Sequence, residues 1–182
     1  MPGADPRTLA EQIRRAFSEA PPPSPDDLLN THDGEEPYLL EDEFHHVPAW
    51  TGLEAELLDE SPAGYGTALG LFSTAAFRYY LPAFLLADLE RALDRVDPAV
   101  HLWRGFDDAL RNEPMHARAL GGWTWFDAMA LRFESFTLDE AEAIVSYLKF
   151  RAERDPEWRR KIGESLRNYW NPRLLHLARR PR

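Results

Sequence analysis

Carboxylates and histidines are concentrated between Glu41 and His46, and these side chains can bind a divalent metal ion. On a helix, Glu41 and His45 share one face because they are four residues apart, and so do Asp42 and His46. A catalytic ion usually has three protein ligands and an open position. The sources for a third ligand are His32, His101, His116 or a distant carboxylate. The metal candidates Glu41, His45 and His46 would suit a metal-dependent hydrolase, but we favour an acidic helix whose histidines lie beside carboxylates.

Other kinds of catalytic site find little support in the sequence. There is no cysteine, which excludes thiolate catalysis and cysteine-based zinc sites, and no serine occupies a Gly-x-Ser-x-Gly motif. The glycines between Gly64 and Gly70 come close to the dinucleotide-binding motif, but one residue too many precedes the third glycine, and no strand precedes the first. We interpret this segment as a flexible connection, predict no catalytic residue and expect no cofactor.

Arg78 is a single cation in an apolar and aromatic stretch, between Phe77 and the pair Tyr79-Tyr80. A guanidinium in such surroundings can bind a phosphate or a carboxylate. It can also stack on a tyrosine ring or pair with an internal acid, which is the interpretation that we favour. In either case we expect Arg78 to have a partner.

The charge of the chain is unevenly distributed. No Lys or Arg occurs between Arg15 and Arg78, and the acids of that stretch give it a charge of −13. From Lys149 onward, eleven bases oppose four acids. The two ends could lie together in the fold, which we favour, or the acidic stretch could bind a basic partner. The candidate partner-binding residues are Glu35, Glu36, Glu41, Asp42 and Glu43.

The overall charge argues against a nucleic-acid partner. The net charge of the chain is −10, which opposes non-specific binding to a polyanion even though the C-terminal stretch is basic. No stretch approaches the length of apolar sequence that spans a bilayer, and the N-terminus lacks the apolar core of a signal peptide. We therefore expect a cytoplasmic protein with a basic protein partner, and we make no prediction about its oligomeric state.

Hydrophobic periodicity predicts a mainly α fold, a single-domain irregular helical bundle. Ser73 is a suitable N-cap for a helix through Tyr80, Pro82 should break or kink it, and Thr137 and Glu140 form a capping box. In the segment from Trp123 to Phe136 we expect the first residues to form turn or extended structure, and we leave a small strand pair as an open alternative. The predicted helices span residues 6–19, 51–59, 73–80, 82–93, 97–112, 137–154 and 155–171.

Prolines and charges divide the chain into four predicted parts. Residues 1–20 form an N-terminal helical arm with Asp5 as its N-cap, and residues 21–26 form a proline-rich linker. Residues 27–172 form the helical core domain, because Asn171-Pro172 should stop the last helix. Residues 173–182 form a basic tail.

The string Ala75-Ala76-Phe77-Arg78-Tyr79-Tyr80-Leu81-Pro82-Ala83-Phe84-Leu85-Leu86 resembles a phrase found in a family of uncharacterised bacterial proteins. In that family a similar phrase, AFRYYLPAYL, precedes an amphipathic helix, and a phrase like the one at 136–144 opens a late helix. The resemblance covers residues 69–93 and 132–148. It implies a bacterial origin and a common fold, and it transfers no catalytic residue.

The leading functional prediction is a non-catalytic protein-interaction protein, similar to bacterial immunity or antitoxin proteins, whose acidic stretch binds a basic partner. It rests on the base-free stretch and on the lack of an assembled catalytic set in the sequence. The alternatives are the metal-dependent hydrolase described above and a scaffold with no enzymatic role.

Overall fold

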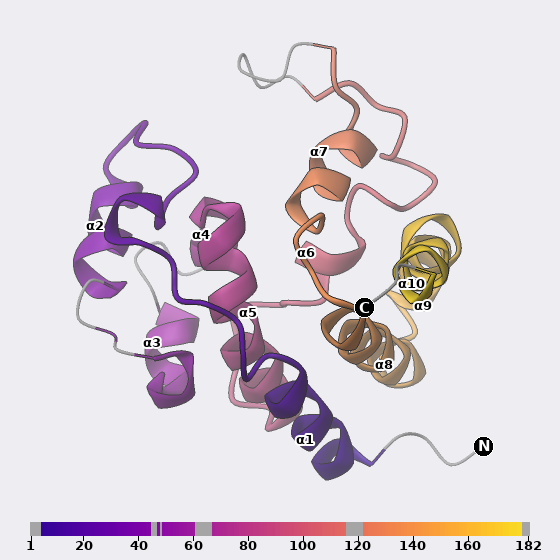
Figure 1. Cartoon of the computed structure of the whole chain (residues 1–182), viewed down its shortest axis with the longest axis horizontal. Coiled ribbons are helices and arrows are strands. Elements are labelled where there is room, and N and C mark those ends of the chain that lie inside the picture. Colours follow the sequence, from indigo (N-terminus) through magenta and orange to yellow (C-terminus); the bar gives the residue numbers. More distant parts are fainter. Residues whose placement is uncertain (1–4, 45–46, 48, 61–66, 116–121, 180–182) are drawn as a thin grey trace. The chain divides into compact units, whose positions relative to one another are not determined.

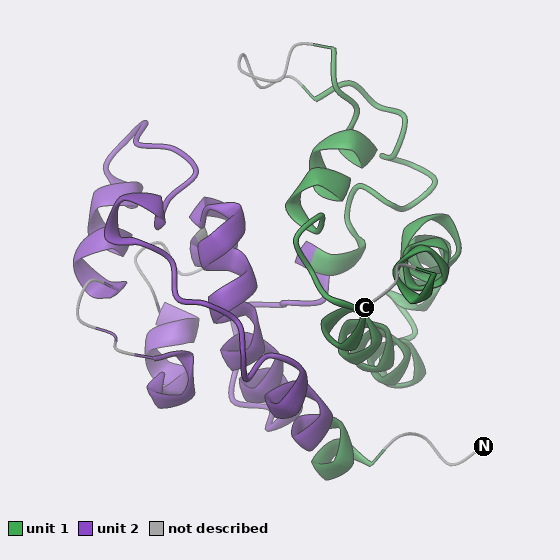
Figure 2. Cartoon of the chain, in the orientation of Figure 1, with its two compact units in different colours: residues 1–9, 102–182 green, residues 10–101 purple. Residues whose placement is uncertain are grey.

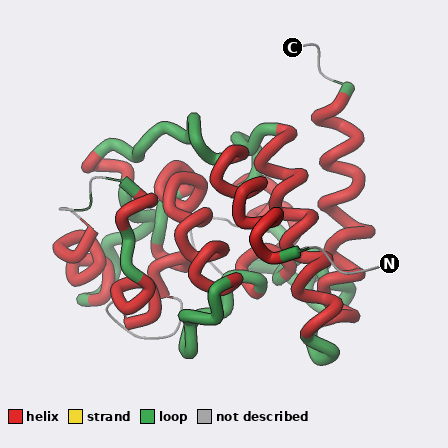
Figure 3. Tube along the Cα trace, turned by 90° about the horizontal axis from the view of Figure 1, so that it is seen from below, coloured by secondary structure: helices red, strands yellow, loops and turns green. Residues whose placement is uncertain are grey.

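The regular secondary structure in the described part of the chain is helical. The computed structural model describes residues 5–44, 47, 49–60, 67–115 and 122–179 (Figure 1). Within these ranges the regular elements are helices, and β pairing is limited to two isolated bridges, Leu29 with Phe72 and Pro114 with Thr124 (Figure 3). The mainly α prediction is confirmed. None of the helices in these ranges combines the length and the apolar character that crossing a membrane requires.

The chain forms two compact units, which Figure 2 colours separately. Unit 2 consists of residues 10–101, and unit 1 consists of residues 1–9 and 102–182. Each unit is described by itself below.

Unit 2 is organised around one long helix, α5. In this unit α3 and the 3₁₀ turn η2 pack against α5, and Phe44, Phe72 and Tyr80 form an aromatic cluster beside it, with ring centroids 5.0–5.2 Å apart. The elements are α1 (Pro6–Ala16, which begins in unit 1), η1 (Pro25–Asp27), α2 (Glu36–Phe44), η2 (Trp50–Gly52), α3 (Ala55–Glu60), α4 (Thr67–Leu71) and α5 (Thr74–Leu89).

Helix α5 is continuous through Pro82, so the predicted break into two helices at this residue is wrong, and the alternative of a kink stays a prediction. Ser73 caps it as expected, because its Oγ accepts a hydrogen bond from the Ala76 amide at 3.1 Å. Pro82 lies inside the helix and cannot donate to the carbonyl one turn earlier. Leu81, Phe84 and Leu85 around it are fully buried. Their packing offsets the lost hydrogen bond, because burying each such side chain is worth about 1.5–3 kcal/mol.

Two other predicted helices of unit 2 begin or end differently in the structure. Asp5 caps α1 as predicted, since its Oδ2 accepts from the Thr8 amide at 3.3 Å, but the helix ends at Ala16. The helix predicted over residues 51–59 is instead η2 followed by α3, because Leu53 is extended (φ −75°, ψ 126°). The prolines that follow α1 and the extended residue that precedes α3 shorten both helices.

Unit 1 is built on a C-terminal run of helices that pack on one another. Its elements are α6 (Val100–Trp103, which begins in unit 2), α7 (Trp125–Arg132), α8 (Leu138–Arg154), α9 (Arg159–Ser165), the π-helical turn η4 (Leu166–Trp170) and α10 (Asn171–Ala178). Both α7 and α8 open with a capping box, at Thr124 with Asp127 and at Thr137 with Glu140. The box at Thr137 is confirmed. The box at Thr124 explains why the residues after it are helical rather than extended or paired as strands.

The helix predicted over residues 97–112 is only the short α6, because Gly105 follows it with a φ of +86°. Other residues avoid this left-handed conformation. A Cβ at this position would also lie 2.8 Å from Cγ of Met129 and 3.2 Å from the Trp125 carbonyl oxygen. Gly105 therefore ends α6 and lets α7 approach the backbone closely.

The helix that follows α9 passes through Asn171-Pro172, so the prediction that it stops there is wrong. The wider turn η4 precedes α10, and the Asn171 amide donates to the Leu166 carbonyl across it. Pro172 then occupies the first turn of α10, where a missing amide costs least. The described part of the predicted basic tail is consequently helical as far as Ala178.

Candidate functional site

Most of the predicted acidic residues lie on helix α2, on the side away from its buried residues. Pro37, Leu40 and Phe44 are buried, which fixes the orientation of the helix. Four of the five predicted partner-binding residues are exposed: Glu35, Glu36, Asp42 and Glu43. The fifth, Glu41, is half-buried and lines a small cavity of about 140 Å³ with Pro22–Pro25 and Tyr79. The exposed acids thus lie away from the buried side of α2, and Glu41 is less exposed than they are.

Two large apolar side chains lie on the same exposed face. Tyr38 is 58% exposed and Leu39 is 53% exposed. Tyr38 is four residues before Asp42, and Leu39 is four residues before Glu43, so each apolar side chain shares a helix face with an acid. We call the exposed side chains of Glu35, Glu36, Tyr38, Leu39, Asp42 and Glu43 the α2 face.

Sequence reasoning missed the apolar part of this face. Tyr38 and Leu39 belong to the run Tyr38-Leu39-Leu40, which by composition alone looks like core. Only Leu40 of the three is buried. The available signal was the spacing of Pro37, Leu40 and Phe44, which gives one side of a helix and leaves Tyr38 and Leu39 on the other.

Buried aromatic contacts hold α2 in place. The Phe44 ring meets Phe72 and Tyr80 edge to face, with centroids 5.0 Å away in both cases. Burial first, and the neighbouring Tyr79 second, raise the pKa of Tyr80 above 10.0, so its hydroxyl stays neutral in this cluster. Because the inner side of α2 is packed on rings, its outer face is presented on a fixed support.

The metal candidates are only partly within the described chain. His45 and His46 lie outside the described residues, as does His116. Within the described ranges, no group of three or more potential ligands comes together. His32 lies near Tyr38, with ring centroids 6.3 Å apart. The metal-dependent hydrolase therefore stays a prediction.

Arg78 lies half-buried on α5. Its predicted role in anion binding or internal pairing also stays a prediction.

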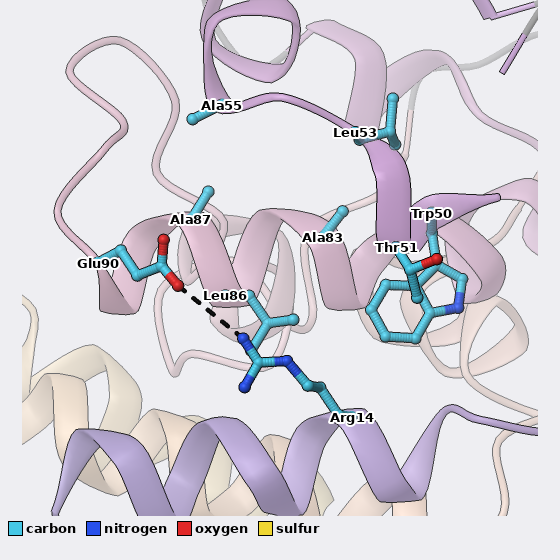
Figure 4. A pocket seen from close by; sticks show the side chains of 9 residues that line it. All are labelled: Arg14, Trp50, Thr51, Leu53, Ala55, Ala83, Leu86, Ala87 and Glu90. Carbon is cyan, nitrogen blue, oxygen red and sulfur yellow. Dashed lines mark ion pairs between the residues drawn. The ribbon is translucent and has the colours of Figure 1, made fainter.

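A second feature of unit 2 is the cavity drawn in Figure 4, with a volume of about 200 Å³. Arg14 of α1 and Glu90, at the end of α5, form an ion pair of 3.9 Å. The remaining lining residues are mostly apolar: Trp50, Thr51, Leu53, Ala55, Ala83, Leu86 and Ala87. The cavity therefore combines a charged end with apolar walls.

Unit 1 has a polar cluster centred on Asp108. Asn168 donates to Oδ1 of Asp108 at 2.9 Å and Arg167 donates to Oδ2 at 2.8 Å. The Asp108 amide donates to Oε2 of Glu164 at 3.1 Å, and Arg160 binds the other carboxylate oxygen of Glu164 at 2.6 Å. The hydrogen bond from Asn168 and the charge of Arg167 lower the pKa of Asp108. We call these five residues the Asp108 cluster.

Aromatic rings lie next to this cluster. Phe106 stacks on Tyr169 with centroids 4.0 Å apart, and Trp170, which is fully buried, donates from Nε1 to the Leu102 carbonyl at 2.9 Å. Burial raises the pKa of Tyr169 to about 12. The charges of the Asp108 cluster are thus used to join the π-helical turn to the segment after α6.

Comparison with known proteins identifies a family but no activity. No curated protein matches the chain, and no solved structure matches it. A family model described as a family of unknown function, DUF6714, matches residues 6–174. This range includes the α2 face, the cavity beside α5 and the Asp108 cluster. The chain therefore belongs to the DUF6714 family.

Proposed function

We propose that the chain is a protein-interaction protein whose α2 face binds a basic, amphipathic partner. The observation that carries this proposal is the exposure of Tyr38 and Leu39 among four exposed acids, three on α2 and Glu35 directly before it. Exposed tyrosine is typical of residues that dominate binding energy, and surrounding charges guide the approach of an oppositely charged partner. A partner helix with apolar residues flanked by lysine or arginine would complement both features.

The buried aromatic support of α2 favours such a role. A helix fixed before binding loses little conformational freedom when the partner arrives, so more of the contact energy becomes affinity. A toxin neutralised by this face, as in immunity and antitoxin proteins, is one basic partner of this kind. A scaffold role would use the same face with a different partner.

The proposal is tested by removing the apolar part of the face without changing its charge. The probe is a short synthetic amphipathic helix of lysine and leucine residues, titrated by isothermal calorimetry. We expect Tyr38→Ser with Leu39→Ser to weaken binding by about 2 kcal/mol, or roughly thirtyfold.

The matched control replaces two other exposed leucines, Leu131→Ser with Leu175→Ser, which are 47% and 61% exposed. It should leave the affinity unchanged. Equal losses in both double variants, or no loss at Tyr38 and Leu39, would show that the α2 face is not the binding surface.

A further inference from the structure

The cavity between α1, η2, α3 and α5 has an uneven distribution of polarity. In Figure 4, Glu90 and Arg14 lie towards one end and Trp50 and Thr51 towards the other. Ala83 and Ala87 project from α5 between them, and Ala55 lies across from Ala87. These three alanines leave space that larger side chains would fill. The cavity volume is about 200 Å³, whereas a cavity of roughly 150 Å³ is enough to hold benzene.

The charged pair at the end of the cavity is loosely held. Nη2 of Arg14 is 3.9 Å from Oε1 of Glu90, which is beyond hydrogen-bond distance, and the two side chains are 53% and 69% exposed. Exposed pairs with this geometry contribute little to stability. A ligand that offers each group a direct charge-assisted hydrogen bond can therefore replace the pair at little cost.

A ligand of this cavity needs both charges. A simple anion that binds Arg14 would be placed next to the carboxylate of Glu90, and a simple cation that binds Glu90 would be placed next to the guanidinium of Arg14. A zwitterion avoids both repulsions. The walls formed by Leu53, Ala83 and Leu86 in turn select an uncharged apolar body, since a charge buried there would have no compensating partner.

We propose that this cavity binds a free α-amino acid with an apolar side chain. Arg14 binds the α-carboxylate, Glu90 binds the α-ammonium group, and the side chain lies along Ala83 and Ala87. This site is independent of the α2 face and does not require the proposed function.

The proposal is tested with L-leucine as the probe. Binding is followed through the NMR signals of the Ala83 and Ala87 methyl groups, which line the cavity. N-acetyl-L-leucine lacks the ammonium group and L-leucinamide lacks the carboxylate, so we expect each to bind about tenfold more weakly than L-leucine. Arg14→Gln should abolish the preference for L-leucine over L-leucinamide, and Glu90→Gln should abolish the preference over N-acetyl-L-leucine.

Arg15→Gln and Glu11→Gln are the matched controls, because both residues are exposed on α1 and neither lines the cavity. Both should keep the two preferences. The proposal is overturned if L-leucine causes no saturable shift at about 10 mM, if L-leucinamide and N-acetyl-L-leucine bind as well as L-leucine, or if the controls lose the preferences as Arg14→Gln and Glu90→Gln do. All four substitutions are at exposed side chains, so the fold should be retained.

Discussion

The α2 face of unit 2 contains four carboxylates and the Asp108 cluster of unit 1 contains two, and their surroundings differ. Asp108 and Glu164 accept hydrogen bonds from Asn168, Arg167, Arg160 and a backbone amide. On α2, by contrast, four acids are exposed beside Tyr38 and Leu39. In the Asp108 cluster the two acids are balanced by Arg160 and Arg167, whereas the α2 face combines four exposed acids with two exposed apolar side chains, which suits it to binding.

The comparison also changes the interpretation of the basic C-terminal stretch. Arg160 and Arg167 form ion pairs with Glu164 and Asp108, and Arg151 forms one with Asp155. These three bases are therefore paired with acids of their own unit. Two of these pairs join residues within the C-terminal stretch itself, and Arg167 alone of the three pairs with an acid outside it, Asp108.

The largest expected effect lies in the aromatic core beside the Asp108 cluster. Trp170→Ala removes a fully buried ring and its hydrogen bond to the Leu102 carbonyl, so we expect the free energy of unfolding to fall by about 3–5 kcal/mol. Urea denaturation measures the change. Trp123→Ala, at a ring that is 37% exposed, should cost less than about 1 kcal/mol. Similar losses from both variants would contradict the packing described here.

Two glycines with the same φ allow the cost of a left-handed conformation to be distinguished from the cost of a steric clash. Gly105 and Gly122 both have a φ of +86°, but a Cβ would meet neighbouring atoms only at Gly105. Gly122→Ala should cost about 1–2 kcal/mol from the left-handed conformation alone, and Gly105→Ala should cost a further 1–2 kcal/mol from overpacking. Thermal or urea unfolding compares them, and equal costs would show that Met129 and Trp125 move aside freely.

The pH dependence of stability tests the pairing of Asp108. Because its pKa is below 3.8 in the folded protein, its ionised form stabilises the fold at pH values above 3.8, and this contribution is lost as the pH falls through the folded pKa. Asp108→Asn should therefore flatten the decline in stability between about pH 5 and pH 3.

Asn168→Ala, which removes the strongest cause of the shift, should move the pKa of Asp108 upward in an NMR titration. An unchanged pKa would contradict the assigned cause.

The smallest expected effect is on the stability of the α2 face. Tyr38→Ser and Leu39→Ser replace exposed side chains, so each should change the free energy of unfolding by no more than about 0.5 kcal/mol. Urea denaturation of the single variants gives this value. A loss above about 2 kcal/mol would place these residues in the core and remove them from the binding surface.

The helix starts that could be predicted from the sequence are those at which a side chain caps the helix. Asp5, Ser73 and Thr137 cap helices by contacts within three residues, so the sequence shows them directly. The end of α6 depends on Gly105 meeting Met129, and the passage through Pro172 depends on the wider turn η4. Such features arise from contacts between distant residues, which local patterns do not contain.

The candidate site also has one part that the sequence predicts and one part that it does not. Its acids follow from composition, whereas the exposure of Tyr38 and Leu39 depends on which side of α2 meets Phe72 and Tyr80. The cavity beside α5 joins Arg14 to residues far along the chain, and no spacing in the sequence indicates it.

The central claim is that the position of the acids on α2, and not the total charge, determines binding. Two variants test it. In each of them four acids are replaced by lysine, so both change the net charge of the chain by the same amount. The first reverses the exposed acids of the α2 face: Glu35, Glu36, Asp42 and Glu43. The second reverses exposed acids elsewhere: Glu11, Glu19, Glu153 and Glu157.

The dissociation constant of the lysine and leucine peptide is measured by calorimetry at low and at physiological salt for both variants and for the unchanged chain. We predict that reversal on the α2 face weakens binding at least about tenfold at low salt and removes its salt dependence, while reversal elsewhere changes the affinity by less than about threefold. Equal losses from the two variants would mean that total charge alone governs the interaction, and the account of the α2 face would then be wrong.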